Sequence, residues 1–581
     1  MDAASPAAVR AAARRFSMKP SRILAALAFL SLLAACSPVP SPDVAYDPAA
    51  LSFSGERALA IEAEFVMRFP DRDSGQPNNR LAAEWLVETV GGLGFDCALD
   101  EWSFVNYSRQ IPLHNAVCIL PGESDSEIVL TAHHDQAPTT VYGADNDGSG
   151  VAILVHLAEV FAAEGTPPRT LVFLFADAEE FGNAGTRRYL DTHPDPQRIL
   201  AALSIDNVGK RWYVGLDMDP RGWFLGYGAL WLQRAAQESA RAAGDLWVPV
   251  IRPAPFQALE QAVPIAFMDE GPFVARGIPS FGFAGICDPE FSQICYDTYH
   301  TPDDTIETQS SESLRQTGRV TEALVRQIQG MESFPEESGP YLYFESKSSV
   351  LRGLPLTLVF LLPVAGFLFT AWKTAPSDWL AAWRRALPPF LSLFLPILLS
   401  VGLLYGLVAV GLLQKFDAYF ATTKDPAWTS PRCPAIGVWL LGLALLLTVG
   451  RRLTGRFHPP DFDAARSLAF LTLGLASLFI AVTNPFSLLF VLPCFSWLLI
   501  RGRRGFGFAL DLLFFALGGL LVYVLIYFFG FVILRIGLYV LWYLLMMFAI
   551  PMISPAGAAA IAAILAAGLS LVVRPPRLRA P

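Results

Sequence analysis

Long apolar runs in the second half of the chain constrain its fold more than any other feature. From about residue 350 onward, segments of membrane-spanning length follow one another, separated by clusters of arginine. Such segments cross a bilayer as helices, because a helix satisfies its backbone polar groups internally. We therefore expect a polar first part followed by an all-α, multispan transmembrane domain. About eight spans are expected, near residues 354–372, 387–413, 434–450, 467–482, 485–500, 507–529, 531–552 and 556–573.

The two parts differ in charge. From residue 350 onward there are about 18 Lys and Arg against about 6 Asp and Glu, so this part is near +12 and the first part is near −21. The acidic first part argues against a nucleic-acid partner. With that part outside the membrane, the basic clusters fall on the cytoplasmic side for six spans. Eight spans would leave Arg574, Arg577 and Arg579 outside, so one of the last segments is re-entrant or wrongly assigned.

The expected spans contain few ionisable residues. Only Asp511 and Arg535 stand out, and both lie near the ends of segments. A transporter needs more charged groups inside the membrane. We therefore interpret this half as an anchor in the lipid bilayer, or as a platform for a membrane-protein partner.

The N-terminus has the features of a secretory signal, residues 1–36. Lys19 and Arg22 precede an apolar run over residues 23–33, which ends in the sequence LAAC with Cys36 last. This ending resembles the bacterial lipobox, in which the cysteine becomes the lipidated first residue of the mature protein. Cys36 is therefore a candidate lipid anchor, and the alternative is an uncleaved signal anchor with Cys36 as a buried thiol. Either form indicates a bacterial inner-membrane protein whose polar domain faces the periplasm.

Export implies an oxidising compartment, in which cysteines can pair. Cys287 and Cys295 lie eight positions apart in a loop shortly before His300, and a disulfide between them would hold that loop in place. Cys97 and Cys118 could also pair. Both lie in apolar, strand-like surroundings, where reduced thiols in the core are equally plausible.

The polar part alternates strand and helix patterns from residue 55 to residue 335. This alternation predicts an α/β domain with a mixed central sheet and helices on both faces. Linkers over residues 37–54 and 336–352 flank the domain, the transmembrane domain covers residues 353–574, and a tail of residues 575–581 follows. Three apolar strands run directly into polar side chains, and ligands of open α/β sheets bind at the carboxyl ends of the strands.

Five short patches rich in carboxylates and histidine supply the groups that a two-metal hydrolase needs. They are His133-His134-Asp135, the segment from Asp145 to Gly150, Glu179-Glu180, Asp206 and His300-Thr301. Carboxylate and imidazole together suit zinc. Two cations about 3.5–4 Å apart can activate a water and stabilise the oxyanion of a cleaved amide.

In order and type, these patches resemble the family of co-catalytic zinc aminopeptidases that also contains glutaminyl cyclases and glutamate carboxypeptidases (clan MH). The family pattern is His-x-Asp, Gly-Ala-x-Asp-x-x-Ser-Gly, Glu-Glu after a strand, Asp after the next strand, and a late His-Thr-x-x-Asp-Thr. This chain has His133 to Asp135, Gly143 to Gly150, Glu179-Glu180, Asp206 and His300 to Thr305 at those places. The resemblance covers about residues 55–335, and the multispan plan resembles that of endoplasmic-reticulum and vacuolar members.

The resemblance implies a peptide substrate, two zinc ions per chain and a role for each residue. His133 and Asp206 would bind one zinc, and Glu180 and His300 the other, with a carboxylate bridging both. Glu179 would be the general base that takes a proton from the attacking water and returns it to the leaving amine. Asp135 would orient His133.

Two positions depart from the family pattern. Asn146 stands where the family has its bridging aspartate, and a neutral amide offsets the charge of two cations poorly. In one alternative, Asp145 or Asp147 bridges the two metals instead, so both residues are candidate ligands. In the other, the centre holds one tight zinc and one weak zinc. We favour a flanking aspartate as the bridge, because the general base and the other four ligands are all present. Glu270 replaces a histidine of the pattern Ser-Asp-His-x-Pro-Phe, so substrate specificity does not transfer.

The sequence therefore favours an exported, membrane-anchored zinc metallopeptidase, specifically an aminopeptidase acting on short peptides. Two alternatives come from other classes. A glutaminyl-cyclase-like acyltransferase needs one zinc and a pocket for an N-terminal glutamine. A peptidase-like binding module would have lost turnover through its weakened bridge.

Overall fold

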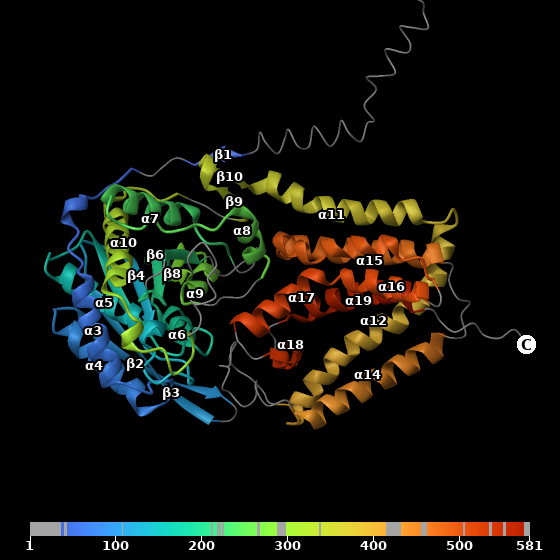
Figure 1. The fold of residues 1–581 in the computed structure, drawn as a ribbon, viewed down its shortest axis with the longest axis horizontal. Helices are drawn as coiled ribbons and strands as arrows, with labels where there is room; N and C mark the ends of the chain where they lie inside the picture. The colour runs from blue at the N-terminus through green and yellow to red at the C-terminus, as the bar shows by residue number, and fades with distance from the viewer. Residues whose placement is uncertain are drawn as a thin grey trace, which may run out of the picture.

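An α/β domain and a bundle of apolar helices lie beside one another in the computed structural model (Figure 1). The last strand of the first part, β10, leads directly into the first helix of the bundle, α11. The structure describes residues 36–39, 43–106, 109–210, 213–217, 222, 226–263, 268–286, 298–335, 339–413, 432–454, 462–503, 506–533, 537–549 and 553–573. The apolar run of the expected signal, the pair Cys287 and Cys295, and the C-terminal arginines lie outside these residues.

A seven-stranded mixed sheet forms the centre of the α/β domain, with strand order β2-β3-β5-β4-β6-β8-β7. Its central strands β5, β4, β6 and β8 are parallel, whereas β2, β3 and β7 run antiparallel to their neighbours. The mixed sheet predicted from the sequence is confirmed. The strands are β2 (Asp96–Asn106), β3 (Arg109–Leu120), β4 (Ser124–His133), β5 (Arg169–Ala176), β6 (Ile199–Asp206), β7 (Tyr213–Asp217) and β8 (Ser280–Ile286).

Helices cover both faces of this sheet because its central strands are apolar on both sides. Ile128 and Leu130 of β4 join a large core with α3, α4, α5, α7 and α10. Val129 points to the other face and joins a smaller core with α6 and α9. The helices are α3 (Gly55–Arg68), α4 (Pro77–Gly91), α5 (Ser149–Ala162), α6 (Ala184–Thr192), α7 (Leu230–Ala243), α8 (Ala254–Gln261), α9 (Glu270–Ala275) and α10 (Ser311–Gly330).

The cysteines of β2 and β3 form a disulfide. Cys97 and Cys118 lie directly opposite one another in the register of this antiparallel pair. Of the two alternatives that the sequence left open for them, the paired form is the one observed.

Both expected linkers contain short strands rather than only irregular chain. β1 (Ser37–Pro38), β10 (Ser349–Arg352) and β9 (Tyr341–Phe344) form a small antiparallel sheet in the order β1-β10-β9. The segment after Cys36 is thereby tied to the strand that enters the first membrane helix. Cys36 itself packs against an apolar cluster that includes Leu351 and Leu356.

The second part is helical, as the sequence predicts. Among the described residues, five helices are long and apolar enough to cross a membrane, or six if one pair bent by 63° counts as a single span. Two further apolar stretches, Pro485–Leu499 and Gly537–Ala549, are shorter. The long helices are α11 (Gly353–Thr374), α12 (Trp379–Ala409), α14 (Cys433–Thr454), α15 (Phe462–Thr483) and α19 (Pro555–Val572), and the bent pair is α16 (Phe506–Leu517) with α17 (Leu520–Tyr527). The count of about eight spans stays a prediction.

The helix α18 (Val540–Ala549) packs against one end of the bundle only. Its residues Trp542 and Met546 contact the cluster of Leu404 and Ala435, where α12 ends and α14 begins. By contrast, the last residues of α19 pack with Ala371 and Ile500 at the opposite end. That one of the last segments is re-entrant or wrongly assigned stays a prediction.

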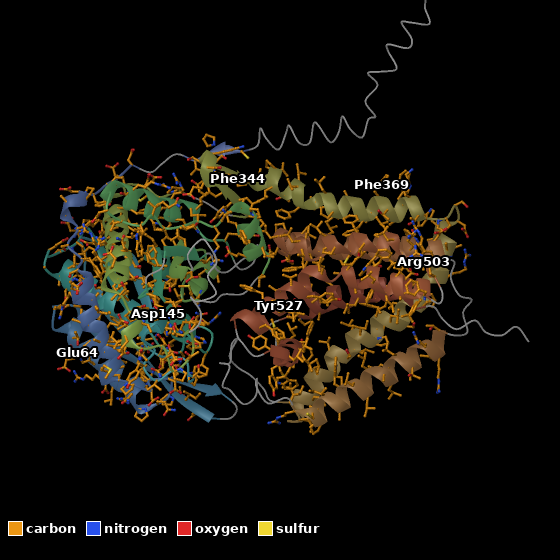
Figure 2. The ribbon with its side chains drawn as sticks, in the orientation of Figure 1. Glu64, Asp145, Phe344, Phe369, Arg503 and Tyr527 are labelled. Carbon is orange, nitrogen blue, oxygen red and sulfur yellow. A yellow bond between two sulfur atoms is a disulfide. The ribbon has the colours of Figure 1, made fainter. Side chains whose placement is uncertain are left out.

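The two parts of the chain touch directly. The side chain of Asn484 donates a hydrogen bond of 2.7 Å to the carbonyl oxygen of Gln261, and Ser487 donates one of 2.7 Å to that of Ala262. Next to these bonds the rings of Tyr227 and Phe486 meet edge to face. Figure 2 shows Phe344 near this junction, and Phe369 and Arg503 at the end of the bundle away from the α/β domain.

Candidate metal centre

Three parallel strands deliver the predicted site residues to one edge of the sheet. His133 is the last residue of β4, Asp206 is the last residue of β6, and Glu179 with Glu180 follows β5 by three residues. The loop Ala144–Gly148 lies beside them and leads into α5. Because parallel strands end at the same edge of a sheet, side chains far apart in sequence meet there.

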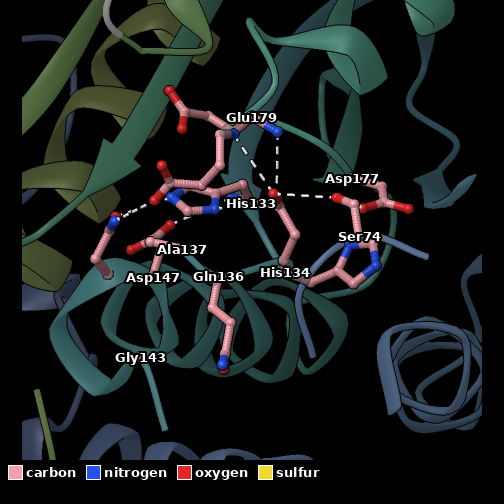
Figure 3. A network of polar contacts seen from close by, with 12 residues as sticks. Ser74, His133, His134, Gln136, Ala137, Gly143, Asp147, Asp177 and Glu179 are labelled. Atoms are coloured by element: carbon pink, nitrogen blue, oxygen red, sulfur yellow. Dashed lines mark hydrogen bonds and ion pairs between the residues drawn. The ribbon is translucent and has the colours of Figure 1, made fainter. Parts of the chain in front are cut away.

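The structure brings His133, Glu179, Glu180, Asp147 and Asp206 together. Ligand atoms of His133, Asp147 and Asp206 lie within 4.8 Å of one another, and so do those of His133, Glu179 and Glu180. The Nε2 atom of His133 lies 3.7 Å from Asp206 Oδ1. His300 joins the same cluster, because its Nε2 atom lies 2.8 Å from Glu180 Oε1. Figure 3 shows His133, Asp147 and Glu179 around this centre.

Two of these buried atoms have an oppositely charged neighbour but no well-directed hydrogen bond among the described residues. They are Nε2 of His300, beside Glu180, and Oδ1 of Asp206, beside His133. A buried polar atom without a partner costs free energy, so such atoms are rare in folded proteins. A cation shared between imidazole and carboxylate would satisfy both atoms. The donor set of imidazole nitrogen and carboxylate oxygen fits zinc.

Asp135 contacts both halves of the centre, the half with His133 and the half with Glu180, and thereby holds them in place. Its Oδ1 atom lies 3.2 Å from Nδ1 of His133 and accepts the backbone N–H of Glu179 at 3.2 Å. Its Oδ2 atom accepts the N–H of Glu180 at 3.4 Å. Burial by itself would raise the pKa of Asp135, but the hydrogen bond and charge of His133 outweigh it and hold that pKa below its ordinary value.

The same contacts act on His133. Burial opposes the charged imidazole, but Asp135 and Asp206 raise the pKa of His133 well above its ordinary value. Without a metal this shift favours the doubly protonated ring, and metal binding there would have to release a proton.

Glu179 lies in surroundings that favour a bound proton. Its carboxyl group is buried, and burial raises the pKa of Glu179 well above its ordinary value, with the nearby negative charge of Glu180 adding to the effect. Asn183 donates a hydrogen bond of 3.3 Å to Glu179 Oε1. A carboxyl group with this preference can accept a proton and give it back during a reaction.

Asn146 occupies the space between the two halves. Its Oδ1 atom lies 3.0 Å from Nε2 of His133, and its Nδ2 atom donates a hydrogen bond of 2.7 Å to Glu180 Oε1. The amide of Asn146 thus spans the gap where the family pattern has its bridging carboxylate.

The flanking aspartates are engaged elsewhere. Oδ1 of Asp145 accepts the N–H of Gly209 at 2.9 Å, and its Oδ2 lies 3.8 Å from Nζ of Lys210. The structure therefore does not bring Asp145 into the cluster. Asp147 accepts the N–H groups of His133 at 3.2 Å and of Gly150 at 2.9 Å, although it stays within reach of His133 and Asp206. The roles of Asp145 and Asp147 as ligands remain predictions.

Arg72 and Asp304, for which the sequence pattern predicts no role, fix the backbone of this loop. The buried guanidinium of Arg72 donates hydrogen bonds to the carbonyl oxygens of His134 at 2.9 Å and Gly143 at 2.8 Å, and also to that of Tyr142. From the other side, the carboxylate of Asp304 accepts the N–H groups of Asp145 at 2.8 Å and Asn146 at 3.2 Å. Arg72 lies some sixty residues before the first patch, where no spacing signals it. Asp304 lies within the late motif that carries the resemblance.

Behind Asp135 a second buried carboxylate completes a polar network. The hydroxyl of Ser74 lies 3.3 Å from Asp135 Oδ2 and 2.8 Å from Asp177 Oδ1 (Figure 3). Asp177 also accepts Asn79 Nδ2 at 2.9 Å and the N–H of His114 at 2.8 Å. Burial raises the pKa of Asp177 to about 7, and the charge of Asp135 contributes.

Glu270, which replaces a histidine of the family pattern, is fully buried against β8. A Cβ atom at Gly282 of that strand would lie 2.7 Å from Oε2 of Glu270, so the glycine makes room for the carboxylate. The adjacent Asp269 accepts a hydrogen bond of 2.6 Å from the hydroxyl of Thr186. Burial raises the pKa of Asp269 to about 6.

Comparison with known families agrees with this geometry. Residues 115–325 match the model of peptidase family M28. Over these residues the chain is similar to peptidase family M28. The resemblance inferred from the five patches is thereby confirmed, and so is the α/β fold that it implied.

Curated relatives include aminopeptidase YwaD of Bacillus subtilis, which is 28% identical over 211 residues that make up 36% of this chain and 42% of that protein. A vacuolar membrane protease of Clavispora lusitaniae is 32% identical over 117 residues, 20% of this chain and 11% of that protein. The human BOS complex subunit NCLN is 29% identical over 160 residues, 24% of this chain and 27% of that protein. The chain thus matches less than half the length of these relatives.

Solved structures that match part of this chain include a glutaminyl cyclase of Porphyromonas gingivalis. It has 21% sequence identity and a TM-score of 0.41, and the match covers 47% of this chain and 99% of that structure. A zinc aminopeptidase of Bacillus subtilis has 16% identity and a TM-score of 0.41, with 48% and 96% covered.

Proposed function

We propose that this chain is a membrane-anchored zinc metallopeptidase of the aminopeptidase type. The observation that carries the proposal is the meeting of His133, Glu180, Asp206 and His300 beside the buried carboxyl of Glu179. Nε2 of His300 and Oδ1 of Asp206, which are buried without a well-directed hydrogen bond, support a metal at this place. The family M28 match supports peptide bonds as the bonds that are cleaved.

In this proposal His133 and Asp206 hold one zinc, and Glu180 and His300 hold the other. When bound, zinc polarises the peptide carbonyl group and stabilises the negative charge that develops on its oxygen. Glu179 accepts a proton from water as the water oxygen attacks the carbonyl carbon. It then gives that proton to the amine nitrogen as the C–N bond breaks. Asp135 keeps the ring of His133 in its orientation throughout.

Asn146 makes the two halves unequal. Its carbonyl oxygen faces His133, whereas its NH2 group faces Glu180. An amide nitrogen that carries two hydrogens cannot act as a ligand, so only the His133 half gains an oxygen from Asn146. We therefore expect one tight zinc at His133 and Asp206 and one weak zinc at Glu180 and His300. A bridge by a flanking aspartate, Asp145 or Asp147, stays the alternative prediction.

The geometry also supports an outward-facing catalytic domain. Lys373, Arg451 and Arg503 lie at the end of the bundle away from the α/β domain, and basic residues flank spans on the cytoplasmic side. We propose that the α/β domain faces the periplasm of a bacterial inner membrane. Cys36 packs next to the start of α11, so an acyl chain on its thiol would reach the bilayer.

The proposal is tested by zinc analysis of the purified full-length protein together with a panel of aminoacyl reporter substrates and N-terminal glutaminyl peptides. Hydrolysis that depends on zinc and on Glu179 supports the peptidase. Release of cyclised glutamine with one zinc per chain would favour the glutaminyl-cyclase-like alternative. The expectation of one tight and one weak zinc is the observation that favours this alternative. If the protein binds no zinc and turns over no substrate, the result would support the third alternative, a peptidase-like binding module.

A further inference from the structure

The segment that follows α15 joins the membrane half to the α/β domain. It forms the short helix η7 (Pro485–Phe490), whose N-cap is Asn484. Oδ1 of Asn484 accepts the N–H of Phe486 at 3.2 Å, and Nδ2 of the same side chain donates to the carbonyl oxygen of Gln261 in the α/β domain. Asn484 is buried, so water does not compete for these bonds. One amide group therefore orders η7 and binds the α/β domain at once.

The junction supplies hydrogen-bond donors that α8 lacks. The last four carbonyl groups of a helix have no partner within it, and α8 ends at Gln261. Asn484 donates to the carbonyl oxygen of Gln261, and Ser487 donates to that of Ala262, each at 2.7 Å. The chain reaches Met268, two residues before α9, six positions after Ala262. The membrane half thus holds the chain within a few residues of the start of α9.

A second contact leads from the junction to α9. The ring of Phe486 meets that of Tyr227 edge to face, with ring centroids 6.4 Å apart. The preceding residue, Gly226, has a φ of 87° and lies against α9, because a Cβ atom there would clash with the carbonyl oxygen of Val274. One peptide bond therefore separates a residue that touches the membrane half from a residue that touches α9. Figure 1 shows α8 and α9 on the side of the α/β domain that faces the bundle.

The position of α9 depends on its neighbours. It has six residues, and isolated helices shorter than about 12 residues are marginal in water. Asp269, just before α9, accepts a hydrogen bond of 2.6 Å from the hydroxyl of Thr186 in the first turn of α6. Asn183, the N-cap of that helix, donates one of 3.3 Å to Glu179 Oε1. The start of α6 therefore connects α9 with the carboxyl group assigned as the general base.

We propose that Asn484 and Ser487 are positioning residues, through which the membrane half holds α9 and thereby the general base Glu179 in place. This role rests on the proposed peptidase function, because it acts through the base of that reaction. The base must lie within hydrogen-bond reach of the attacking water, and a displacement of about 1 Å can lower a rate about 10²-fold. The bundle is then part of the catalytic unit as well as its anchor.

Hydrogen exchange of the full-length protein in a mild detergent, read by mass spectrometry, measures how firmly α9 is held. Asn484→Ser keeps a side chain that caps η7, since serine and asparagine are similar N-caps, but serine is too short to reach Gln261. Ser487→Ala removes only the bond to Ala262. In both variants we expect the backbone amides of residues 268–276 to exchange about fivefold faster, the factor that one hydrogen bond contributes to a local equilibrium. Those of α4, which lies away from the bundle in Figure 1, should exchange as before.

The same variants test the link to Glu179. In both, kcat for an aminoacyl reporter substrate should fall about fivefold, while zinc per chain stays unchanged because none of the four proposed ligands lies in α8 or α9. Ser487→Thr keeps the hydroxyl group and should behave as the unchanged protein does. The control Ser496→Ala removes a hydrogen bond of the same length, 2.7 Å to the carbonyl oxygen of Phe514, within the membrane half alone. It should alter neither measurement.

The outcomes separate the junction from the reaction. Unchanged exchange at residues 268–276 in both variants, or an equal rise in Ser496→Ala, would overturn the role of the junction. Faster exchange with unchanged kcat would overturn the link from α9 to Glu179. Exchange needs no substrate, so a protein that shows the expected exchange but hydrolyses no substrate in any form would contradict the proposed function and not the junction.

Discussion

Replacing Asn146 by aspartate tests the unequal metal centre most directly. The variant exchanges the NH2 group that faces Glu180 for a carboxylate oxygen, so that both halves gain an anionic ligand. A unit charge about 4 Å from another contributes about 4 kcal/mol at the effective dielectric constant of a protein, a factor of roughly 10³ in affinity. Repulsion offsets part of this gain, because the new oxygen takes a place 2.7 Å from Glu180 Oε1. We expect the weaker zinc to bind about 10²-fold more tightly.

The assay is competition for zinc against a chelator of known affinity, with zinc per chain counted at each free concentration. The unchanged protein should fill in two separate steps, and Asn146→Asp should bring the steps together. Without zinc the variant should melt at a lower temperature than the unchanged protein, because the added carboxylate then repels that of Glu180 without a cation between them. The exposed exchange Gln76→Glu serves as the control, since it makes the same chemical change outside the centre. If Asn146→Asp leaves both zinc affinities unchanged, Asn146 does not lie between the metals.

Three further predictions follow from the same structure. Glu179→Gln should retain zinc but lower hydrolysis by at least 10²–10⁴, and near-normal turnover would contradict the assigned base. Cys36→Ala should abolish incorporation of labelled palmitate while the chain stays in the membrane fraction through its helices; unchanged labelling would rule out lipidation at Cys36. Burial raises the pKa of Asp269 to about 6, so its stabilising contribution is present below about pH 4 and is lost as the pH rises through 6. In melting scans of the metal-free protein, Asp269→Asn should make the decline smaller by the share of Asp269, while buried carboxyls such as Asp177 keep theirs. An identical pH profile would refute the contribution.

The strands that carry the site could be predicted because their sequences are continuous apolar runs. Leu171 to Phe175 and Leu203 to Ile205 are buried on both faces of the sheet, and the polar residues that follow them come to lie at its edge. A parallel central sheet requires this pattern. The meeting of His133 with Asp206 was therefore accessible from local sequence alone.

Side-chain directions within the loop could not be predicted in this way. Asp145 turns toward Gly209 and Lys210, and its backbone N–H binds Asp304, so its orientation depends on segments about 60 and 160 residues away. Nothing in the neighbouring sequence reports these contacts. The membrane half shows a similar limit. Composition indicates that Pro485–Leu499 and Gly537–Ala549 are apolar. It does not indicate that the helices in these stretches are shorter than a membrane span requires.

The clamp that Arg72 and Asp304 place on the loop has a consequence for how such a centre can evolve. A shift of the loop by one residue would break hydrogen bonds to Gly143, Asp145 and Asn146, and bonds to charged groups contribute about 1.5–3 kcal/mol each. The backbone thus keeps position 146 between the two halves whatever side chain it carries. Codons for asparagine and aspartate differ by a single base. One point mutation can therefore change the preferred number of metals while the fold around the loop stays as it is.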